Sequence, residues 1–327
     1  MKGNTVDRAP VLPQIGDHAG IINGLSFDTM YRDAKKSTEA HLKALELYGY
    51  DITTIQVEPS WPVSESCGAR VNYPPDKNPW ITKFPIEDKK SLERLEIPDF
   101  MECNSTKVMI EGTNLLSENA NVPIAAYMTG PITFSFQLMP YELLIPTMIK
   151  DPEFTHHLVK KSIEIIRKYI KLLKEAGASI LVLCEHDYQL LKPQQVKDFS
   201  LDYMECLLKI YDFNILHMCG KISTHLQYLG NIIKQIKNLD MISVDSFVGI
   251  SEARGILENK IGIAGNIDHV RLLPQGSPQE VKKAVYNALK ENQNNPRFMV
   301  APGCEITADT TIENVKAFVS ASKSFRI

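Results

Sequence analysis

A short apolar run that recurs eight times, each time followed by an amphipathic stretch, is the feature of this sequence that most constrains its fold. Each run is almost continuously apolar, which is typical of strands buried on both faces of a parallel sheet. The sequence therefore predicts strands at Val11–Gly16, Asp51–Val57, Val122–Met128, Ser179–Cys184, Phe213–Met218, Met241–Asp245, Ile261–Gly265 and Arg297–Ala301.

The stretches between these runs have the periodicity of amphipathic helices. Phe154–Ala176 is the clearest, because its apolar residues recur every three or four positions and Gly177 follows as a C-terminal cap. Pro193 and Pro278 stand where the first turn of a helix tolerates proline. Further helices are predicted over Pro193–Tyr211, Ser223–Ile236, Pro278–Asn292 and Thr310–Ser322.

Strands that alternate with helices in this way predict an α/β fold, a (β/α)8 or TIM barrel. We expect residues 1–327 to form a single domain, since no linker, repeat or low-complexity tract interrupts the chain. The stretch between the first two strands and the piece Ser60–Asn121 are interpreted as N-terminal elaborations of the barrel. An open doubly wound sheet is the alternative. It is disfavoured because no Gly-x-Gly-x-x-Gly follows an early strand.

Charge and composition exclude several classes of function. The chain has 36 Lys and Arg against 39 Asp and Glu, a net charge of −3, whereas nucleic-acid binding usually needs a basic surface. No apolar run approaches the roughly 18–20 residues of a membrane span. Met1–Thr5 leads into no apolar leader segment, and the six cysteines are scattered. We therefore expect reduced thiols and a cytoplasmic location.

Three possible metal ligands stand where predicted strands end, which is where the functional site of a TIM barrel lies. His217 and Cys219 are two residues apart, so in an extended chain both side chains point to one face, roughly 6–7 Å apart at the backbone. Cys304 is distant in sequence, but a closed barrel brings the ends of its strand and theirs around one cavity. Two thiolates and an imidazole are a good zinc set with one position left open. Burial as ordinary core residues is the alternative.

The other cysteines lack this geometry, and packing is the better interpretation for Cys67, Cys103, Cys184 and Cys206. His186 is interpreted as a hydrogen-bonded residue at the cavity rim, with metal ligation as the alternative. A zinc ion with two thiolates and a neutral imidazole has no net charge and is a poor generator of hydroxide. It can still hold a substrate thiol as thiolate, which favours alkyl transfer to sulfur.

The chain resembles the uroporphyrinogen decarboxylase superfamily, and within it the corrinoid-dependent methyltransferases of the methylcobamide:coenzyme M type. The similarity runs from about residue 9 to the C-terminus, and the His-x-Cys-Gly and Pro-Gly-Cys pair marks the methyltransferase branch. The matching stretches are Tyr127-Met128-Thr129-Gly130-Pro131, Leu216-His217-Met218-Cys219-Gly220-Lys221, Ile242-Ser243-Val244-Asp245, Gly262-Ile263-Ala264-Gly265-Asn266-Ile267 and Ala301-Pro302-Gly303-Cys304-Glu305-Ile306.

This resemblance implies a TIM barrel that uses zinc to activate a thiol, which then receives a methyl group from a methylated corrinoid protein. His217, Cys219 and Cys304 would be the zinc ligands, and the acceptor thiol, a water or a side chain would take the fourth position. Glu185 and Asp245 are candidates for an orienting or fourth-ligand carboxylate, or for support behind the ligands. The methylcobamide would arrive on a separate corrinoid protein, since the chain has no Asp-x-His-x-x-Gly.

Several alternatives remain at this point. Decarboxylation is disfavoured because Leu12–Gly20 lacks the arginine pair that the decarboxylase branch uses to grip substrate carboxylates, and Asp17 would repel a polyanion. The segment Cys184–Tyr188 also departs from the Asp-Pro-x-Ala-Ser type of motif associated with the coenzyme M enzymes. The acceptor could thus be coenzyme M, another thiol or a pterin, or a small methyl donor could supply the corrinoid. A non-catalytic corrinoid- or pterin-binding module is a further hypothesis.

Overall fold

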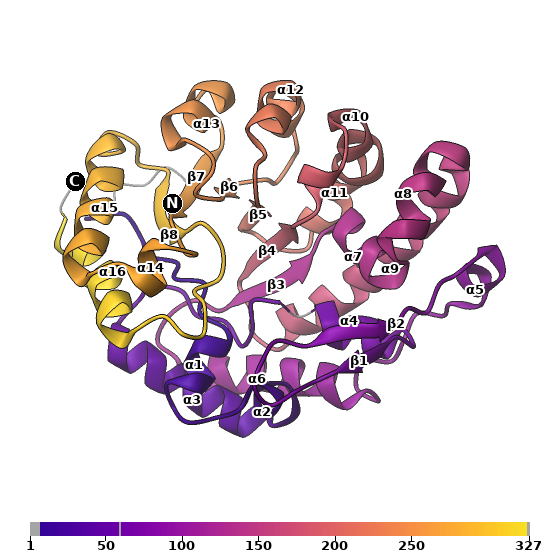
Figure 1. The fold of residues 1–327 in the computed structure, drawn as a ribbon, viewed down its shortest axis with the longest axis horizontal. Helices are drawn as coiled ribbons and strands as arrows, with labels where there is room; N and C mark the ends of the chain where they lie inside the picture. The colour runs from indigo at the N-terminus through magenta and orange to yellow at the C-terminus, as the bar shows by residue number, and fades with distance from the viewer. Residues whose placement is uncertain (1–6, 59, 326–327) are drawn as a thin grey trace.

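The computed structural model describes residues 7–58 and 60–325, and Met1–Thr5, considered above for a leader, lie outside them. Six parallel strands form one sheet in which the spatial order follows the sequence order. Figure 1 shows them in the middle of the molecule with helices around them. The strands are β3 (Ala125–Thr129), β4 (Ile180–Glu185), β5 (Asn214–Met218), β6 (Met241–Val244), β7 (Gly262–Ile267) and β8 (Phe298–Pro302).

Two extended segments near the N-terminus close this sheet into a ring. Val11 pairs in parallel with Val300 of β8, and Thr53 pairs in parallel with Ile124 at the start of β3. The two segments also meet, because the amide of Asp51 donates to the carbonyl of Val11 at 3.2 Å. Backbone hydrogen bonds therefore link β8, both segments and β3. The predicted TIM barrel is confirmed.

The first two predicted strands, Val11–Gly16 and Asp51–Val57, are only partly borne out, because each forms a single bridge instead of a strand. Pro13 has no amide hydrogen to donate, which limits pairing in the first segment. In the second, the hydroxyl of Thr54 donates to the carbonyl of Gln56 at 3.0 Å, so the chain turns soon after its one bridge. The other six predicted strands lie within a few residues of their predicted bounds.

The helices that follow β3 to β8 cover the outside of the barrel (Figure 1). The predicted helix Phe154–Ala176 is α9, and the predicted helix Pro193–Tyr211 is α10 and α11 joined by a π-helical turn, η2. These helices are α7 (Pro131–Leu138), α8 (Tyr141–Lys150), α9 (Pro152–Glu175), α10 (Pro193–Val196), η2 (Lys197–Leu201), α11 (Asp202–Leu208), α12 (Ser223–Ile233), α13 (Ile250–Leu257), α14 (Leu272–Gln275), α15 (Pro278–Glu291) and α16 (Ile312–Ser324); a short 3-10 turn, η1 (Tyr188–Leu190), follows β4.

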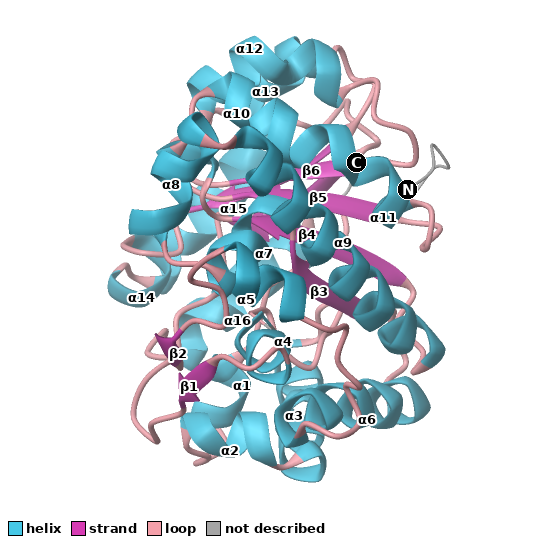
Figure 2. Ribbon diagram, turned by 90° about the vertical axis from the view of Figure 1, so that its right-hand side faces the viewer, coloured by secondary structure: helices cyan, strands magenta, loops and turns pink. Residues whose placement is uncertain are grey.

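The N-terminal part of the chain adds helices and a hairpin to this barrel, as predicted. Figure 2 shows the antiparallel pair β1 and β2 apart from the barrel strands, near α1 and α2. Helices α3 and α6 pack against each other. The added elements are α1 (Asp17–Ile21), α2 (Phe27–Arg32), α3 (Ala34–Tyr48), α4 (Ser60–Ser66), β1 (Arg70–Asn72), β2 (Trp80–Lys83), α5 (Lys89–Arg94) and α6 (Asn104–Asn119).

The barrel strands bury side chains on both faces, which explains their continuous apolar character. Along β4, Val182 and Cys184 belong to a small cluster inside the barrel, while Leu181 and Leu183 belong to the large cluster between the sheet and the helices. The C-terminal ends of the strands surround an opening, the mouth of the barrel. Because side chains alternate along a strand, every second residue near its C-terminal end faces this mouth. Among the described residues, no helix combines the length and apolarity needed to cross a membrane.

Candidate metal centre

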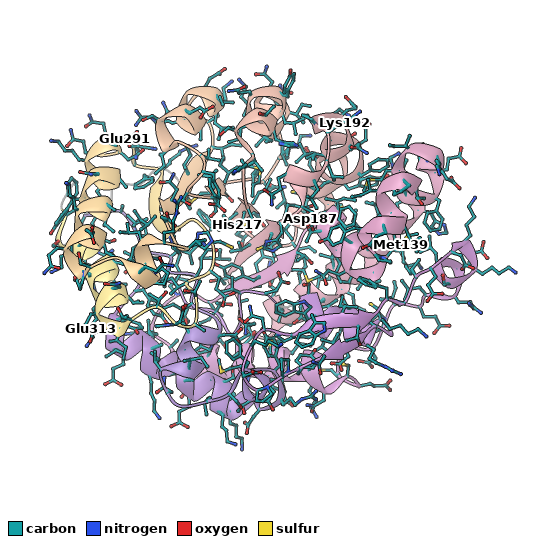
Figure 3. All side chains as sticks on the ribbon, in the orientation of Figure 1. Met139, Asp187, Lys192, His217, Glu291 and Glu313 are labelled. Carbon is teal, nitrogen blue, oxygen red and sulfur yellow. The ribbon has the colours of Figure 1, made fainter. Side chains whose placement is uncertain are left out.

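Four side chains meet in the mouth of the barrel. Potential ligand atoms of His186, His217, Cys219 and Cys304 all lie within 4.8 Å of one another. They come from three places, the segments after β4 and β8 and the end of β5. In Figure 3 the labelled His217 lies near the middle of the ring of strands, whereas Glu291 and Glu313 lie on the outside. The structure thus brings together the three predicted ligands and adds His186.

The strand β5 explains the position of His217. Ile215 is an interior residue, so His217, two residues later, also faces inward. Its Nδ1 lies 3.0 Å from the hydroxyl of Ser243, which is its register partner on β6. Its Nε2 has no hydrogen-bond partner, and the residue is only 1% exposed, so water does not supply one from the surface. A buried ring nitrogen without a partner, beside two thiols, is what a metal ligand presents before its ion is bound.

Cys219 and Cys304 are held by tight turns that involve glycine. Gly220 has a φ of +80°, a backbone conformation that residues other than glycine rarely adopt. A Cβ on Gly303 would lie 2.6 Å from the amide nitrogen of Ser246, so only glycine allows this close approach. The hydrogen bond between the two thiols raises the pKa of Cys219, and the same bond together with His217 lowers the pKa of Cys304. One thiol therefore gives up its proton much more readily than the other.

The two candidate carboxylates lie in different surroundings. Asp245 follows β6 and is buried, and its Oδ2 accepts from the amide of Gly220 at 2.9 Å and lies 3.5 Å from the sulfur of Cys219. Glu185 points away from the mouth. Its oxygens accept from the amides of Ile132 and Thr133 at the start of α7, and burial raises its pKa to about 7. The structure therefore places Asp245 beside the cluster and Glu185 outside it.

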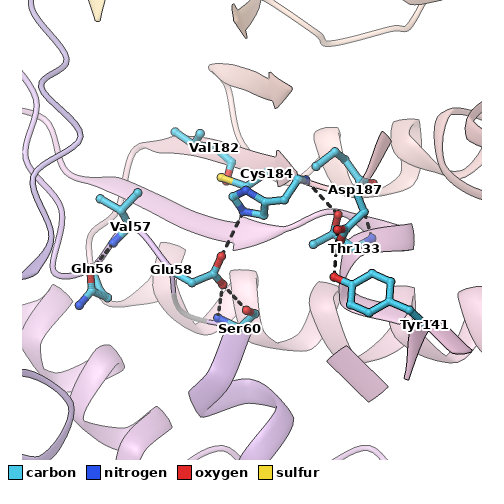
Figure 4. A network of polar contacts seen from close by, with 11 residues as sticks. Gln56, Val57, Glu58, Ser60, Thr133, Tyr141, Val182, Cys184 and Asp187 are labelled. Atoms are coloured by element: carbon cyan, nitrogen blue, oxygen red, sulfur yellow. Dashed lines mark hydrogen bonds and ion pairs between the residues drawn. The ribbon is translucent and has the colours of Figure 1, made fainter. Parts of the chain in front are cut away.

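His186 belongs to the cluster, whereas the sequence interpretation favoured a place at the rim. Its Nε2 lies 3.0 Å from Oε2 of Glu58, at the end of the second extended segment. Figure 4 shows Glu58 bonded to Ser60, with Cys184 nearby. Burial lowers the pKa of His186, but Cys184 and Glu58 outweigh it and raise that pKa. The available signal was that Glu58 directly follows one predicted strand and His186 lies two residues after the end of another.

Several polar groups in the mouth have no hydrogen-bond partner or lie close to another acidic group. The hydroxyl of Tyr127, inside the barrel, has no hydrogen-bond partner. Burial, together with the charges of Cys184, Cys304 and Glu305, raises the pKa of Tyr127. Burial also raises the pKa of Asp17 to about 6, and burial together with Asp17 raises the pKa of Glu305.

The donor set matches a divalent ion of the zinc type. Two sulfurs and imidazole nitrogen are the ligands that zinc prefers, and the buried, unpartnered Nε2 of His217 supplies one of them. Of the remaining cysteines, Cys184 is buried beside His186 but is not one of the four candidate ligands. Cys67 is buried, Cys103 is half-buried and Cys206 is exposed, and none of these three belongs to the cluster.

Comparison with known proteins now places the chain. The family profile described as uroporphyrinogen decarboxylase (URO-D) matches residues 1–325. The chain belongs to the uroporphyrinogen decarboxylase family. Family relatives include the methylcobamide:CoM methyltransferase MtaA of Methanosarcina barkeri, which is 24% identical over 80% of this chain and 77% of its own length. The methylated-thiol–coenzyme M methyltransferase of Methanosarcina mazei is 26% identical over 98% of this chain and 86% of the relative.

The family also contains decarboxylases at similar distance. The uroporphyrinogen decarboxylase of Actinobacillus succinogenes is 25% identical over 90% of this chain and 84% of the relative. Among solved structures, a methyltransferase from Methanosarcina mazei superimposes with a TM-score of 0.87 at 21% identity, over 98% of this chain and 95% of the other. That likeness supports the TIM barrel of the family.

Proposed function

We propose that this protein is a zinc-dependent methyltransferase that moves a methyl group between a methylcobamide on a separate corrinoid protein and a thiol. The observation that carries the proposal is the cluster of His217, Cys219 and Cys304, whose ligand atoms lie within 4.8 Å of one another and of His186. Relatives named as methylcobamide:CoM and methylated-thiol–coenzyme M methyltransferases support methyl transfer as the reaction class.

Bound at these three residues, zinc would hold the acceptor thiol as its thiolate and keep its sulfur nucleophilic. The chain's own residues prepare the site. Ser243 fixes the ring of His217 through Nδ1, which leaves Nε2 directed at the cluster. Asp245 positions the turn at Cys219 and Gly220. Glu185 has a structural role in this proposal, since its carboxylate caps α7.

The proposed reaction balances without an oxidant. The thiolate sulfur attacks the methyl carbon of the methylcobamide, and the carbon–cobalt bond breaks with its electron pair left on cobalt. The products are a methyl thioether and the reduced corrinoid, and the thiol proton passes to solvent. Because the step is a displacement, the chain's task is to position the sulfur and exclude competing nucleophiles.

We also propose the setting of this reaction. Two reduced thiols are needed at the centre, which suits the cytoplasm. We propose that residues 1–327 act as one domain, because a single hydrophobic cluster contains residues from Ala9 to Ala321. The partners would be the corrinoid protein and a small thiol, of which coenzyme M is one candidate.

A spectroscopic assay tests the proposal. The purified, zinc-loaded protein is mixed with methylcobalamin and candidate thiols, and the cobalamin spectrum is followed for conversion to the reduced cobalt species. We expect conversion that depends on both thiol and protein. Conversion with tetrahydrofolate in place of the thiol would point to a pterin acceptor, and cobalamin binding without conversion would point to a binding module. An active protein that holds no metal would contradict the proposal.

The same preparation tests decarboxylation. Asp17 is only 4% exposed, and an acidic group there would disfavour a substrate that carries several carboxylates, which supports methyl transfer instead. We expect no release of carbon dioxide from uroporphyrinogen under conditions in which methylcobalamin is consumed. Decarboxylation without thiol methylation would reverse the assignment.

A further inference from the structure

We propose that the mouth of the barrel selects a thiol substrate whose far end carries a positive charge, such as a small aminothiol, over one that carries an anionic group. This inference rests on the proposed function, because it concerns the substrate that would meet the metal centre. It goes beyond that function by naming the charge of the substrate and the residues that would recognise this charge.

Carboxylates crowd one side of the metal centre. Glu305 directly follows Cys304, and its Oε1 lies 3.1 Å from the amide of Asp17. Asp17 in turn accepts from Nε2 of Gln56 at 2.8 Å. The chain packs so closely here that a Cβ on Gly16 would lie 2.2 Å from the side-chain oxygens of both Gln56 and Glu305. Glu58, two residues after Gln56, lies against His186 of the cluster.

Asp187 adds a carboxylate on the far side of His186. Its Oδ1 accepts from the hydroxyl of Tyr141 at 2.9 Å, a contact drawn in Figure 4. Its Oδ2 is buried and has no hydrogen-bond partner, and the residue is 7% exposed. In Figure 3 Asp187 lies near His217 in the middle of the molecule. The unpartnered oxygen and the unpartnered hydroxyl of Tyr127 are polar atoms that the folded chain itself leaves unsatisfied.

Among the described residues, no lysine or arginine pairs with these acidic side chains. Within residues 7–58 and 60–325, none of the ion pairs made by lysine or arginine involves Asp17, Glu58, Asp187 or Glu305. In the described part of the chain, the basic residue that pairs with one of them is His186, which contacts Glu58. Zinc with two thiolates and neutral imidazole adds no net charge to offset them. Carboxyl groups that are buried or half-buried without a counter-charge are costly to ionise, and a cationic ligand would relieve that cost.

The consequence for the substrate follows from its size. In a thiol of two carbons, the group at the far end lies only a few bonds from the sulfur. With the sulfur at the metal centre, that group lies within reach of Glu58 and Glu305. An ammonium group there would be attracted and could bond to the unpartnered oxygens. A sulfonate or carboxylate would add a further negative charge beside this group of acidic side chains, which is unfavourable.

Two matched series of ligands test the inference. The first consists of aminoethanethiol, mercaptoethanol and mercaptoethanesulfonate, which differ only in the charge of the far group. Their binding to the protein loaded with Co²⁺ in place of zinc is read from sulfur-to-cobalt charge-transfer absorption. The second series is the S-methyl derivative of each, measured by calorimetry on the metal-free protein, because a thioether needs no metal to bind.

We expect aminoethanethiol to bind about tenfold tighter than mercaptoethanol, with mercaptoethanesulfonate weaker still, and the thioethers to follow the same order. The isosteric variant Glu305→Gln keeps an oxygen for the amide of Asp17 and should reduce the preference for the amine severalfold. Asp187→Asn, which keeps an acceptor for Tyr141, should act in the same direction. The control is Glu313→Gln, on the exposed face of α16, which should leave the order unchanged.

The two series separate failure of this inference from failure of the proposed function. If the thiols bind to the loaded protein with equal affinity, or mercaptoethanesulfonate binds best, the charge preference is wrong while the metal and thiol chemistry stands. If the protein binds no metal, the proposed function fails, and the thioether series still decides the charge preference. Absence of saturable binding by the aminothioether would overturn the inference.

Discussion

At the scale of single residues, the two nitrogens of His217 summarise how the chain prepares its candidate centre. One nitrogen is held by Ser243, and the other is buried without a partner. The sequence was sufficient to single out His217, Cys219 and Cys304, because their spacing and their positions after apolar runs can be read directly. It could not show that Glu185 faces α7 and that His186 faces the cluster, since one residue's shift in the end of a strand reverses the direction of a side chain.

Replacing either cysteine of the cluster tests metal binding. We expect Cys219→Ala and Cys304→Ala to lower the zinc content from about one ion per chain to nearly none. Elemental analysis and circular dichroism measure metal and fold together. Cys206→Ala, at an exposed position of α11, is the matched control and should keep its zinc. If both cluster variants fail to fold, the metal is structural and the catalytic proposal loses its support.

Ser243 offers a subtler test. The change Ser243→Ala removes the hydroxyl that contacts Nδ1 of His217 at 3.0 Å, so the ring is no longer held in one orientation. Loss of such a partner behind a metal ligand typically lowers metal affinity about tenfold to a hundredfold. Competition with a chelating dye measures the affinity. Ser320→Ala on the outside of α16 serves as the control. Equal affinities of Ser243→Ala and the unmodified protein would show that the contact is incidental.

At the scale of elements, apolar periodicity predicted long helices well and short pairings poorly. The amphipathic pattern of α9 extends over six turns, so its period could not be mistaken. The π-helical turn η2 inside a predicted helix could not be recognised in the same way, because its residues have the same composition as the helix around them. The first two strands were predicted from apolar runs, yet Pro13 and the turn after Thr53 reduce each to one bridge. Backbone pairing depends on neighbours that a single run does not reveal.

Helix α3 carries a histidine that should make stability depend on pH. His41 is fully buried, and burial lowers its pKa to about 4 from an ordinary value of 6.5. The unfolded chain therefore binds a proton between pH 6.5 and pH 4 that the folded chain does not, so stability falls as pH decreases through that window. The full effect is about 3 kcal/mol, at about 1.4 kcal/mol per unit.

Urea unfolding at pH 7 and at pH 4.5 measures this dependence. The variant His41→Leu should lose part of the acid sensitivity, because it has no group to protonate in the unfolded state. His157→Leu, at an exposed position of α9, is the control and should retain the sensitivity of the unmodified protein. An unchanged slope in His41→Leu would mean that other groups govern the acid response.

At the scale of the whole molecule, the two segments that close the barrel near the N-terminus are joined by an ion pair that the sequence pattern did not reveal. Arg8 bonds to both oxygens of Asp51, at 2.6 and 2.7 Å, and Asp51 also accepts from the amide of Val11 at 2.8 Å. These contacts join the two extended segments beside the bridge to β8. The fold class could be predicted because eight runs alternate with helices, but this ion pair joins residues that no local pattern connects.

Removing that connection should weaken the fold as a whole. We expect Asp51→Ala to lower the free energy of unfolding by about 2 kcal/mol, since it leaves the amide of Val11 and the guanidinium of Arg8 without their acceptor. Glu39→Ala removes an exposed pair with Lys43 on α3 and should cost less than about 1 kcal/mol. Denaturant titrations of the two variants give the comparison. Equal losses would show that the closure does not depend on this contact.

The separation of the candidate ligands along the chain has a consequence for how the protein is made. His217 and Cys219 leave the ribosome long before Cys304. Until Cys304 is in place, the imidazole and the single thiol would bind an ion only weakly. The nascent polypeptide would therefore acquire its ion late, after the eighth strand has been translated and docked. Cellular zinc delivery would act on the finished protein, and retention of the ion would report that the circle of strands has closed.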